Sequence, residues 1–330
     1  MTSAAPLNIT RAGQDDGDLS VAVLLPCYNE AATIGAVIDD FRASVPRARV
    51  YVYDNNSSDD SAAIARSHGA TVVREREQGK GHVVRRMFAD IDADIYILTD
   101  SDATYDAASA PRMVQMLVEE ELDMVTARRV ATSQSAFRAG HRFGNRFLTA
   151  LVSRSFGKPV SDMLSGYRVL SRRFVKSFPA LSGGFEIETE LTVHALELGM
   201  PQAELDTPYH ERPSGSDSKL STWRDGTRIL RQILVLIKEE RPLFFFASIF
   251  VVLVLLSVGL ARPVIVEFLA TGLVPRLPTA VLSTGLMLLA FLSLGCGLIL
   301  DTVTRGRREI KRLHYLRQRG PGARHLSPPE

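Results

Sequence analysis

Cysteine is scarce in this chain of 330 residues, and the motifs that usually accompany metal binding or secretion are missing. The two cysteines, Cys27 and Cys296, lie far apart, which excludes a disulfide framework and favours a reducing compartment. The seven histidines form no HExxH motif and no Cys/His cluster, which argues against zinc. Residues 1–19 lack an apolar core, so we predict a flexible N-terminus rather than a secretory signal.

The chain also has little net charge, because 39 basic residues nearly balance 37 acidic ones. The balance is uneven along the chain. Residues 301–330 hold eight Lys/Arg against three acids, a charge of +5, which leaves −3 for residues 1–300. The sequence therefore argues against a general nucleic-acid binder, and it predicts a basic tail over 301–330.

Between Val21 and about Leu205, short β-branched runs alternate with stretches of helical periodicity. This alternation predicts an α/β domain over 20–220 with a largely parallel, buried sheet. The predicted strands are 21–25, 50–54, 71–74, 95–99 and 124–127, and the predicted helices are 31–43, 61–68, 81–89 and 110–119. Ligands of such sheets bind at the carboxyl ends of the strands.

Two uncharged runs, at 242–261 and 277–300, predict a transmembrane hairpin over 242–300. Each run is long enough to cross a hydrocarbon core of about 30 Å. The preceding stretch, 221–241, carries apolar residues on one side of a helix and arginines on the others, which predicts an amphipathic juxtamembrane helix.

Seven Lys/Arg follow the second run between Arg305 and Arg319, whereas the connector 262–276 holds two. The positive-inside rule then predicts that both ends of the hairpin lie in the cytoplasm, and with them the α/β domain and both termini. We expect a multi-pass protein of a bacterial-type inner membrane. The basic tail would also attract anionic lipid headgroups. Paired hairpins commonly associate, so a homo-oligomer stays open.

Polar side chains follow the first two predicted strands. After the first strand, Pro26 ends the ladder, Tyr28 is placed to stack on a flat ring, and Glu30 is placed to accept hydroxyl bonds. After the second strand, Asp54 is placed to accept the N–H of a nucleobase, and Asn56 follows it. Caps for the next helices are the ordinary alternative for such polar turns.

Two further turns carry charge. Lys80 lies between Gly79 and Gly81, a spacing that lets a backbone approach phosphate but is not a Walker A loop. The strand at 95–99 ends in Asp100-Ser101-Asp102, where two carboxylates one residue apart repel unless a cation is present. Their oxygens suit Mg²⁺ or Mn²⁺.

Together these motifs, from Val21 to about Arg241, resemble those of the inverting glycosyltransferases of family 2, which have the GT-A fold. Within that family the chain is similar to the polyprenyl-phosphate sugar synthases, such as dolichyl-phosphate mannose synthases and undecaprenyl-phosphate glucosyltransferases. Pro26 to Glu30 resembles the opening motif, and Asp54 resembles the nucleobase-contacting aspartate. The resemblance implies donor binding by these residues, by Asn56 and by Lys80.

The resemblance also implies that Asp100, Ser101 and Asp102 form the metal-binding DxD motif. Residues 162–168 (DMLSGYR) and 211–220 (ERPSGSDSKL) look like the acceptor-side signatures of the subfamily. Two features depart from the pattern. Thr104 stands where some relatives have a metal-contacting glutamine, and no Q-x-x-R-W box is present, which argues against processive polymer synthesis.

The resemblance implies transfer of a hexose from a nucleotide sugar, with a UDP-sugar favoured and GDP-mannose open, to a polyprenyl phosphate at the membrane. Such an acceptor is largely dianionic at neutral pH, so it needs little general-base help. Asp162 is then expected to position rather than to remove a proton. Arg128, Arg212 and Lys219 are candidate clamps for the acceptor phosphate, because cationic side chains bind phosphate well.

Two alternatives remain open from the residues. A lipid hydroxyl acceptor would require a true base, for which Asp162 is the candidate. A membrane-anchored scaffold that binds nucleotide sugars without catalysis would keep the fold and lose transfer.

Overall fold

The computed structural model describes residues 9–10, 19–131, 161–184, 186–213, 235, 238 and 241–321. The chain divides into two compact units. The first comprises residues 1–232 together with 311–330, and the second comprises residues 233–310. Most of the predicted amphipathic helix at 221–241 and most of the predicted flexible N-terminus lie outside the described residues.

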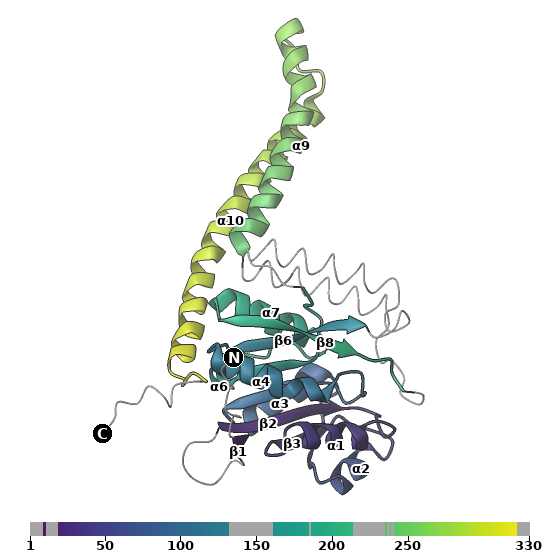
Figure 1. Cartoon of the computed structure of the whole chain (residues 1–330). Helices are drawn as coiled ribbons and strands as arrows, with labels where there is room; N and C mark the ends of the chain where they lie inside the picture. Colours follow the sequence, from purple (N-terminus) through teal and green to yellow (C-terminus); the bar gives the residue numbers. More distant parts are fainter. Residues whose placement is uncertain are drawn as a thin grey trace, which may run out of the picture. The chain divides into compact units, whose positions relative to one another are not determined.

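One twisted, mostly parallel sheet organises the first unit (Figure 1). Its strand order is β4-β3-β2-β5-β7-β6-β8, and β1 adds to β2. Among the described strands, β7 alone runs antiparallel to its neighbours. The strands are β1 (Ile9–Thr10), β2 (Leu19–Cys27), β3 (Arg49–Asp54), β4 (Thr71–Arg74), β5 (Ile95–Leu98), β6 (Met124–Ala131), β7 (Arg168–Ser171) and β8 (Gln202–Tyr209).

Helices cover both faces of this sheet, so the strands are buried on two sides as parallel strands require. Their apolar residues recur at helical spacing and face the sheet. One face is packed by α1 (Ile34–Ser44), α2 (Ser61–Ser67) and α4 (Ala110–Glu119), with the short η1 (Ala107–Ser109). The other face is packed by α3 (Lys80–Asp90), α6 (Arg172–Ser177) and α7 (Ile187–Leu198).

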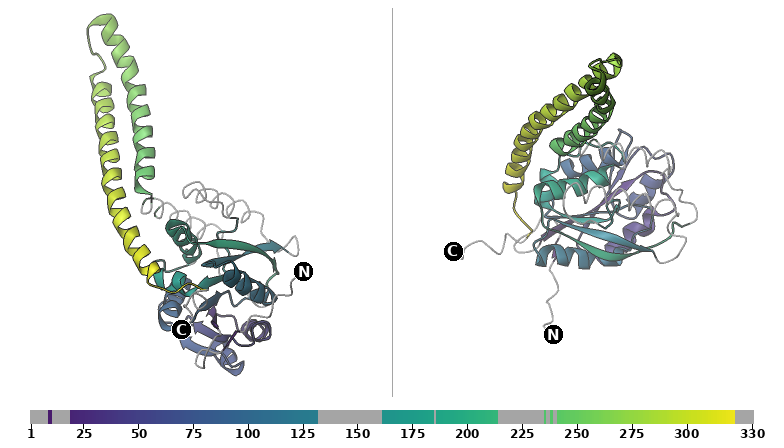
Figure 2. Two further views of the ribbon diagram at one scale, coloured as in Figure 1. Left: turned by 60° about the vertical axis from the view of Figure 1, so that its left-hand side comes forward. Right: turned by 90° about the horizontal axis from the view of Figure 1, so that it is seen from above.

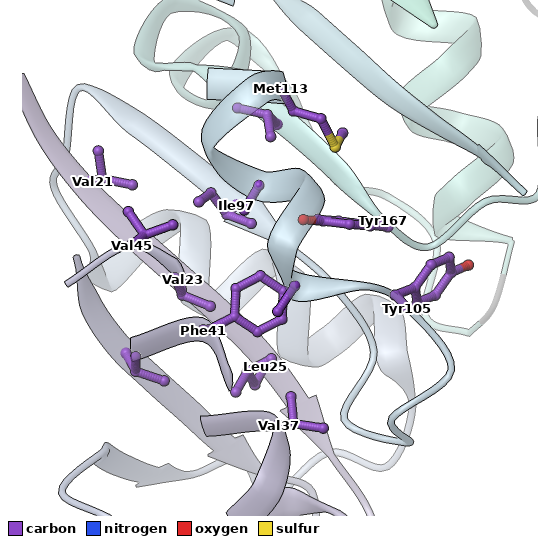
Figure 3. Packing of buried hydrophobic residues seen from close by; sticks show 14 of the residues in the cluster. Val21, Val23, Leu25, Val37, Phe41, Val45, Ile97, Tyr105, Met113 and Tyr167 are labelled. Atoms are coloured by element: carbon purple, nitrogen blue, oxygen red, sulfur yellow. The ribbon is translucent and has the colours of Figure 1, made fainter. Parts of the chain in front are cut away.

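The core beneath α1 leads directly toward the end of the sheet where polar loops gather. Figure 3 shows Phe41 of α1 beside Tyr167, whose ring it meets edge-on at 6.0 Å between centroids. Tyr105 continues this contact, with 5.5 Å between its ring centroid and that of Tyr167. Burial of such side chains contributes about 1.5–3 kcal/mol each. The loop residues near Tyr105 are therefore anchored to the main core.

The α/β architecture predicted from the sequence is confirmed. Each of the five predicted strands and four predicted helices has a counterpart in the structure within a few residues. The strands β1, β7 and β8 were not predicted. β1 has two residues and lies in the segment predicted to be a flexible N-terminus. β7 begins at Arg168, the last residue of the DMLSGYR motif.

The second unit contains two long helices, α9 (Pro242–Thr271) and α10 (Leu277–Leu316), and the end of α10 beyond residue 310 belongs to the first unit. Both are long and apolar enough to cross a membrane. They lie side by side in both views of Figure 2. Four small α10 residues spaced seven apart are buried, namely Ser283, Ala290, Gly297 and Thr304. Gly297 lies against Leu243 and Phe246 of α9. Ser257 of α9 donates to the Ser283 carbonyl at 2.8 Å, so the two backbones approach closely.

Both helices run past the predicted spans. α9 continues through Arg262 and Pro263 to Thr271 and ends at Gly272, whose φ of 69° only glycine adopts freely. α10 continues past residue 300 to Leu316. The boundary predicted at 301 from charge is therefore not a boundary of secondary structure.

Residues 311–330 belong to the first unit. Some of their side chains form ion pairs, hydrogen bonds and ring contacts with that unit. Lys311 forms an ion pair with Glu197 of α7 at 2.7 Å. Tyr315 donates to the Asp123 carboxylate at 2.7 Å, and the Arg173 guanidinium lies 4.9 Å from its ring centroid. At least these residues of the predicted basic tail hold the chain against the α/β domain.

Near this contact, His194 of α7 is buried between the rings of Phe174 and Phe178. Its Nε2 lies 3.2 Å from Ser177 Oγ, and its Nδ1 has no hydrogen-bond partner among the described residues. Burial, together with the charge of Lys311, lowers the pKa of His194 from its ordinary value to about 3. The native state therefore keeps this imidazole neutral.

We expect His194 to make the protein less stable in mild acid. In the unfolded chain the His194 imidazole is protonated below about pH 6.5, whereas in the native chain it stays neutral down to about pH 3. The free energy of unfolding therefore decreases as the pH falls from about 6.5 to about 3. Between pH 7 and pH 5 the loss is about 2 kcal/mol. Thermal unfolding of the detergent-solubilised chain at both pH values measures it.

The matched variants are His194→Phe, which removes the titration, and His314→Gln, which alters an exposed histidine. The first should shrink the difference between the two pH values, and the second should leave it unchanged. An undiminished difference in His194→Phe would refute the assignment.

Candidate active site

Three loops meet where β2, β3 and β5 end, and side-chain bonds join them. Thr33 donates to the Ser101 carbonyl at 2.8 Å, and Ser101 Oγ donates to the Pro26 carbonyl at 2.7 Å. Ser57 Oγ accepts the backbone N–H of Asn29 at 2.9 Å. Pro26 and Ser101, both predicted to contact the donor, are thus bonded to one another, and they fix the DxD turn against the end of β2.

The other residues predicted to bind the donor surround this junction. Tyr28 is 40% exposed and available for stacking, whereas Glu30 is buried. Asp54 is buried at the tip of β3, and its Oδ1 accepts the N–H of Ser57 at 3.3 Å. Asn56 instead donates to the Arg76 carbonyl at 2.8 Å, so its side chain fastens the next loop.

A neighbouring asparagine positions the lysine loop. Asn55 donates to the Glu77 carbonyl at 2.7 Å, and its Oδ1 accepts the N–H of Gly79 at 2.7 Å. These bonds set the start of α3, so that Lys80 projects inward with 7% of its side chain exposed. The sequence motif shows the glycines and the lysine, but it does not show this anchor.

Lys80 is shared between two carboxylates. Its ammonium donates to Asp100 Oδ1 and, at 2.6 Å, to Glu188 Oε1 of α7. Burial alone lowers the pKa of Lys80, but the charges of Asp100 and Glu188 outweigh it and raise that pKa above its ordinary value. The lysine is therefore a fixed positive charge at the DxD turn.

Asp102 meets a second cation. Its Oδ1 accepts both the N–H and the hydroxyl of Thr104, at 3.1 and 2.6 Å, and its Oδ2 pairs with Nη2 of Arg212. Nη1 of Arg212 lies 3.6 Å from Glu30 Oε1. Burial and the charge of Asp100 raise the pKa of Asp102 above its ordinary value, although Arg212 opposes them.

Strand β8 brings Arg212 to this place. The backbone N–H of His210 donates to the Thr104 carbonyl at 2.9 Å, and Tyr105 forms a β-bridge with Tyr209. The turn after the DxD motif is thus paired with the end of β8. Thr104, which replaces the glutamine of some relatives, acts here by orienting Asp102.

The arrangement leaves negative charge uncompensated. Two cations, Lys80 and Arg212, face four carboxylates, those of Asp100, Glu188, Asp102 and Glu30, which leaves a formal charge of −2. No group of three or more Asp, Glu, His or Cys side chains suited to a metal occurs among the described residues. Two carboxylates completed by substrate oxygens fit Mg²⁺ or Mn²⁺, which keep few protein ligands at phosphate sites.

In the segment predicted to face the acceptor, Asp162 is buried and bound by Arg129. Both oxygens accept guanidinium N–H groups of Arg129 at 2.7 Å. Arg128, the residue predicted as a clamp, points elsewhere and forms a two-bond ion pair with Asp206 of β8. Its neighbour Arg129 is the arginine that reaches the predicted site. Lys219 lies outside the described residues.

Arg168, the last residue of the DMLSGYR motif, fixes the backbone of that motif. Its side chain is fully buried and donates to the carbonyls of Ser165, Met163 and Glu188. Burial lowers the pKa of Arg168 to about 10. One buried guanidinium therefore connects the acceptor-side loop with the helix that carries Glu188.

Gly166 of the same motif allows a close approach. A Cβ at this position would lie 2.6 Å from Asp100 Oδ2 and 3.0 Å from Lys80 Nζ. Its N–H donates to the Tyr105 hydroxyl at 2.8 Å. The site has room for the carboxylate and the ammonium only because residue 166 has no side chain.

Cys27, at the end of β2, is a buried thiol. Burial raises its pKa to about 12, although hydrogen bonds with Ser61 and Ser101 oppose the shift. The environment of Cys27 therefore disfavours the thiolate that a nucleophilic cysteine needs.

Comparisons with known proteins point to one enzyme family. A family model described as glycosyl transferase family 2 matches residues 22–178. Glycosyltransferase AglJ of Haloferax volcanii is 33% identical over 299 residues, which covers 90% of this chain and 98% of that protein. A dolichyl-phosphate hexose transferase of the same organism is 29% identical over 222 residues, covering 67% of this chain and 95% of its own.

A solved structure shares the fold. Glucosyl-3-phosphoglycerate synthase from Mycobacterium tuberculosis, crystallised with Mn²⁺, UDP-glucose and phosphoglyceric acid, superposes with a TM-score of 0.55 at 25% identity. The match covers 71% of this chain and 88% of that one.

We expect Gly166→Ala to weaken metal activation. Because the added methyl group must displace the Asp100 carboxylate or Lys80, the Mn²⁺ concentration needed for half-maximal hexose transfer should rise about tenfold or more. Gly285→Ala, which meets open space in α10, is the matched control. Unchanged Mn²⁺ dependence in the Gly166 variant would show that the close approach is immaterial.

Proposed function

We propose, because this chain belongs to glycosyltransferase family 2, that it transfers a hexose from a nucleotide sugar to a polyprenyl phosphate. The observation that carries the proposal is the pairing of two metal-suited carboxylates with two side-chain cations at one edge of the sheet. Such a site would stabilise the negative charge of the phosphate groups of both the donor and the acceptor.

The donor would lie across the ends of β2, β3 and β5. Asp54 is positioned to accept a nucleobase N–H, and Tyr28 is exposed for stacking. We favour a UDP-sugar, because the structural relative was crystallised with UDP-glucose, and GDP-mannose is the second candidate. Asp100 and Asp102 would hold the divalent ion, which supplies positive charge to the leaving diphosphate.

The acceptor would be a phosphate dianion, which must approach a second anion. Unit charges about 4 Å apart repel by about 4 kcal/mol at an effective dielectric constant of about 20, so side-chain cations have to offset the repulsion. Arg212 is placed to do this, and Lys219, which lies outside the described residues, stays a candidate. The dolichyl-phosphate hexose transferase among the relatives and the two apolar helices both support a lipid acceptor.

The same elements support a membrane arrangement. The helices α9 and α10 would span the bilayer as a hairpin, with the catalytic domain and both termini in the cytoplasm as the basic flank predicts. A lipid chain would stay in hydrocarbon while its phosphate reached the site.

A direct test incubates the full chain with UDP- and GDP-sugars, Mn²⁺ or Mg²⁺, and decaprenyl or undecaprenyl phosphate, and measures the lipid product by mass. We expect a product heavier by one hexose. Asp102→Asn should lower the rate by about 100-fold or more, because one metal-binding charge is lost. Full activity with EDTA, or no lipid product with any donor, would refute the proposal.

A lipid hydroxyl acceptor is the competing reaction, and Asp162 discriminates between the two. Three N–H bonds from Arg129 already occupy this carboxylate, which makes it a poor proton acceptor. We therefore expect Asp162→Asn to lower kcat of the folded enzyme less than about tenfold, which is about 1.4 kcal/mol, and to keep the shape of its pH–rate profile.

The variant leaves Arg129 buried without its carboxylate, so some loss of stability is expected, and kcat has to be normalised to folded protein. A loss of several hundredfold, together with a changed acid limb of the pH profile, would instead favour a base and a hydroxyl acceptor.

A further inference from the structure

Arg212 is paired with Oδ2 of Asp102, a carboxylate oxygen that could bind a metal ion. Thr104 donates twice to Oδ1 of Asp102, and Oδ2 is the oxygen that pairs with Arg212. A divalent ion that binds Asp102 from the side of Oδ2 therefore competes directly with the guanidinium. Binding of both cations to one oxygen is disfavoured, because the metal and the guanidinium repel each other in a partly buried site.

The two cations of the site differ in how firmly they are held. Lys80 has 7% of its side chain exposed and bonds to both Asp100 and Glu188. Arg212 has 28% exposed, its second carboxylate Glu30 lies at 3.6 Å, and it extends from the segment after β8 rather than from the sheet. Lys80 is thus a fixed charge, and Arg212 is the cation able to leave.

Glu30 keeps the displaced arginine at the site. Because Glu30 is buried and close to Nη1, the guanidinium loses one partner on metal binding and retains a nearby anion. Its freed N–H donors then face the place where an anionic acceptor has to arrive. Arginine suits this exchange, since its planar fork binds carboxylate and phosphate with the same geometry.

We propose that Arg212 is an internal occupant of the metal site, exchanged from Asp102 to the acceptor phosphate when the metal binds. The exchange keeps the buried carboxylate neutralised in the empty enzyme and makes acceptor binding depend on prior binding of the metal. The identity of the acceptor rests on the proposed function, whereas the competition for Asp102 does not.

The first test measures Mn²⁺ binding to the full detergent-solubilised chain by electron paramagnetic resonance, without donor or acceptor. Arg212→Gln removes the competitor, so its Kd for Mn²⁺ should fall about tenfold relative to the unaltered chain. Arg112→Gln, on the exposed side of α4, is the control and should not change it. Equal or weaker Mn²⁺ binding by Arg212→Gln would overturn the proposal.

The second test repeats the titration with a short prenyl phosphate and, separately, with inorganic phosphate. In the unaltered chain each should tighten Mn²⁺ binding, since the freed guanidinium gains an anion, and by linkage Mn²⁺ should tighten phosphate binding equally. In Arg212→Gln this coupling should fall at least about threefold. Coupling that persists undiminished would overturn the exchange.

The two phosphates distinguish a lipid from a free anion as the source, and the mass of the lipid product tests the reaction on its own. Competition and coupling without a glycosylated polyprenyl phosphate would uphold the exchange and refute the proposed acceptor. A glycosylated product without competition would do the reverse.

Discussion

The site depends on two cationic side chains that are each shared between two carboxylates. Lys80 lies between Asp100 and Glu188, and Arg212 bridges Asp102 and Glu30. Without these pairs the partly buried acids of the DxD turn would repel one another and lose their hydration. In the function proposed above, the same charges would let the diphosphate of the donor and the phosphate of the acceptor approach each other.

The fold brings these paired residues together from distant parts of the chain. The parallel strands β2, β3 and β5 deliver the donor-side loops to one edge, as the α/β arrangement requires. The antiparallel β7 follows Gly166, which leaves space for the Asp100 carboxylate. The end of β8 is hydrogen-bonded to the turn at Thr104, which places Arg212 beside Asp102. Arg168, buried among backbone carbonyls, connects the acceptor-side loop to Glu188 of α7.

Local patterns were sufficient to predict β2 to β6, the helices α1 to α4 and the apolar hairpin, because each depends on periodicity or length within one segment. They did not predict β1, β7, β8, α6 or α7. The motif residues Lys80, Asp100 and Asp102 were predicted from short patterns in the same way. Glu188 and Arg129 were missed, since a lone acid in a helix and one of two adjacent arginines carry no signal until the fold selects a partner. Arg128 was preferred over Arg129 because sequence does not show which of two neighbours faces inward.

Diffraction at the manganese absorption edge, from crystals of the full chain grown with Mn²⁺ and UDP, tests the electrostatic account most directly. The account predicts one anomalous peak bound by oxygens of Asp100 and Asp102 at about 2.1 Å, with Lys80 still on Asp100 and the Arg212 guanidinium withdrawn from Asp102. A peak bound by other residues, or one at Asp102 with Arg212 still paired to the same oxygen, would contradict it.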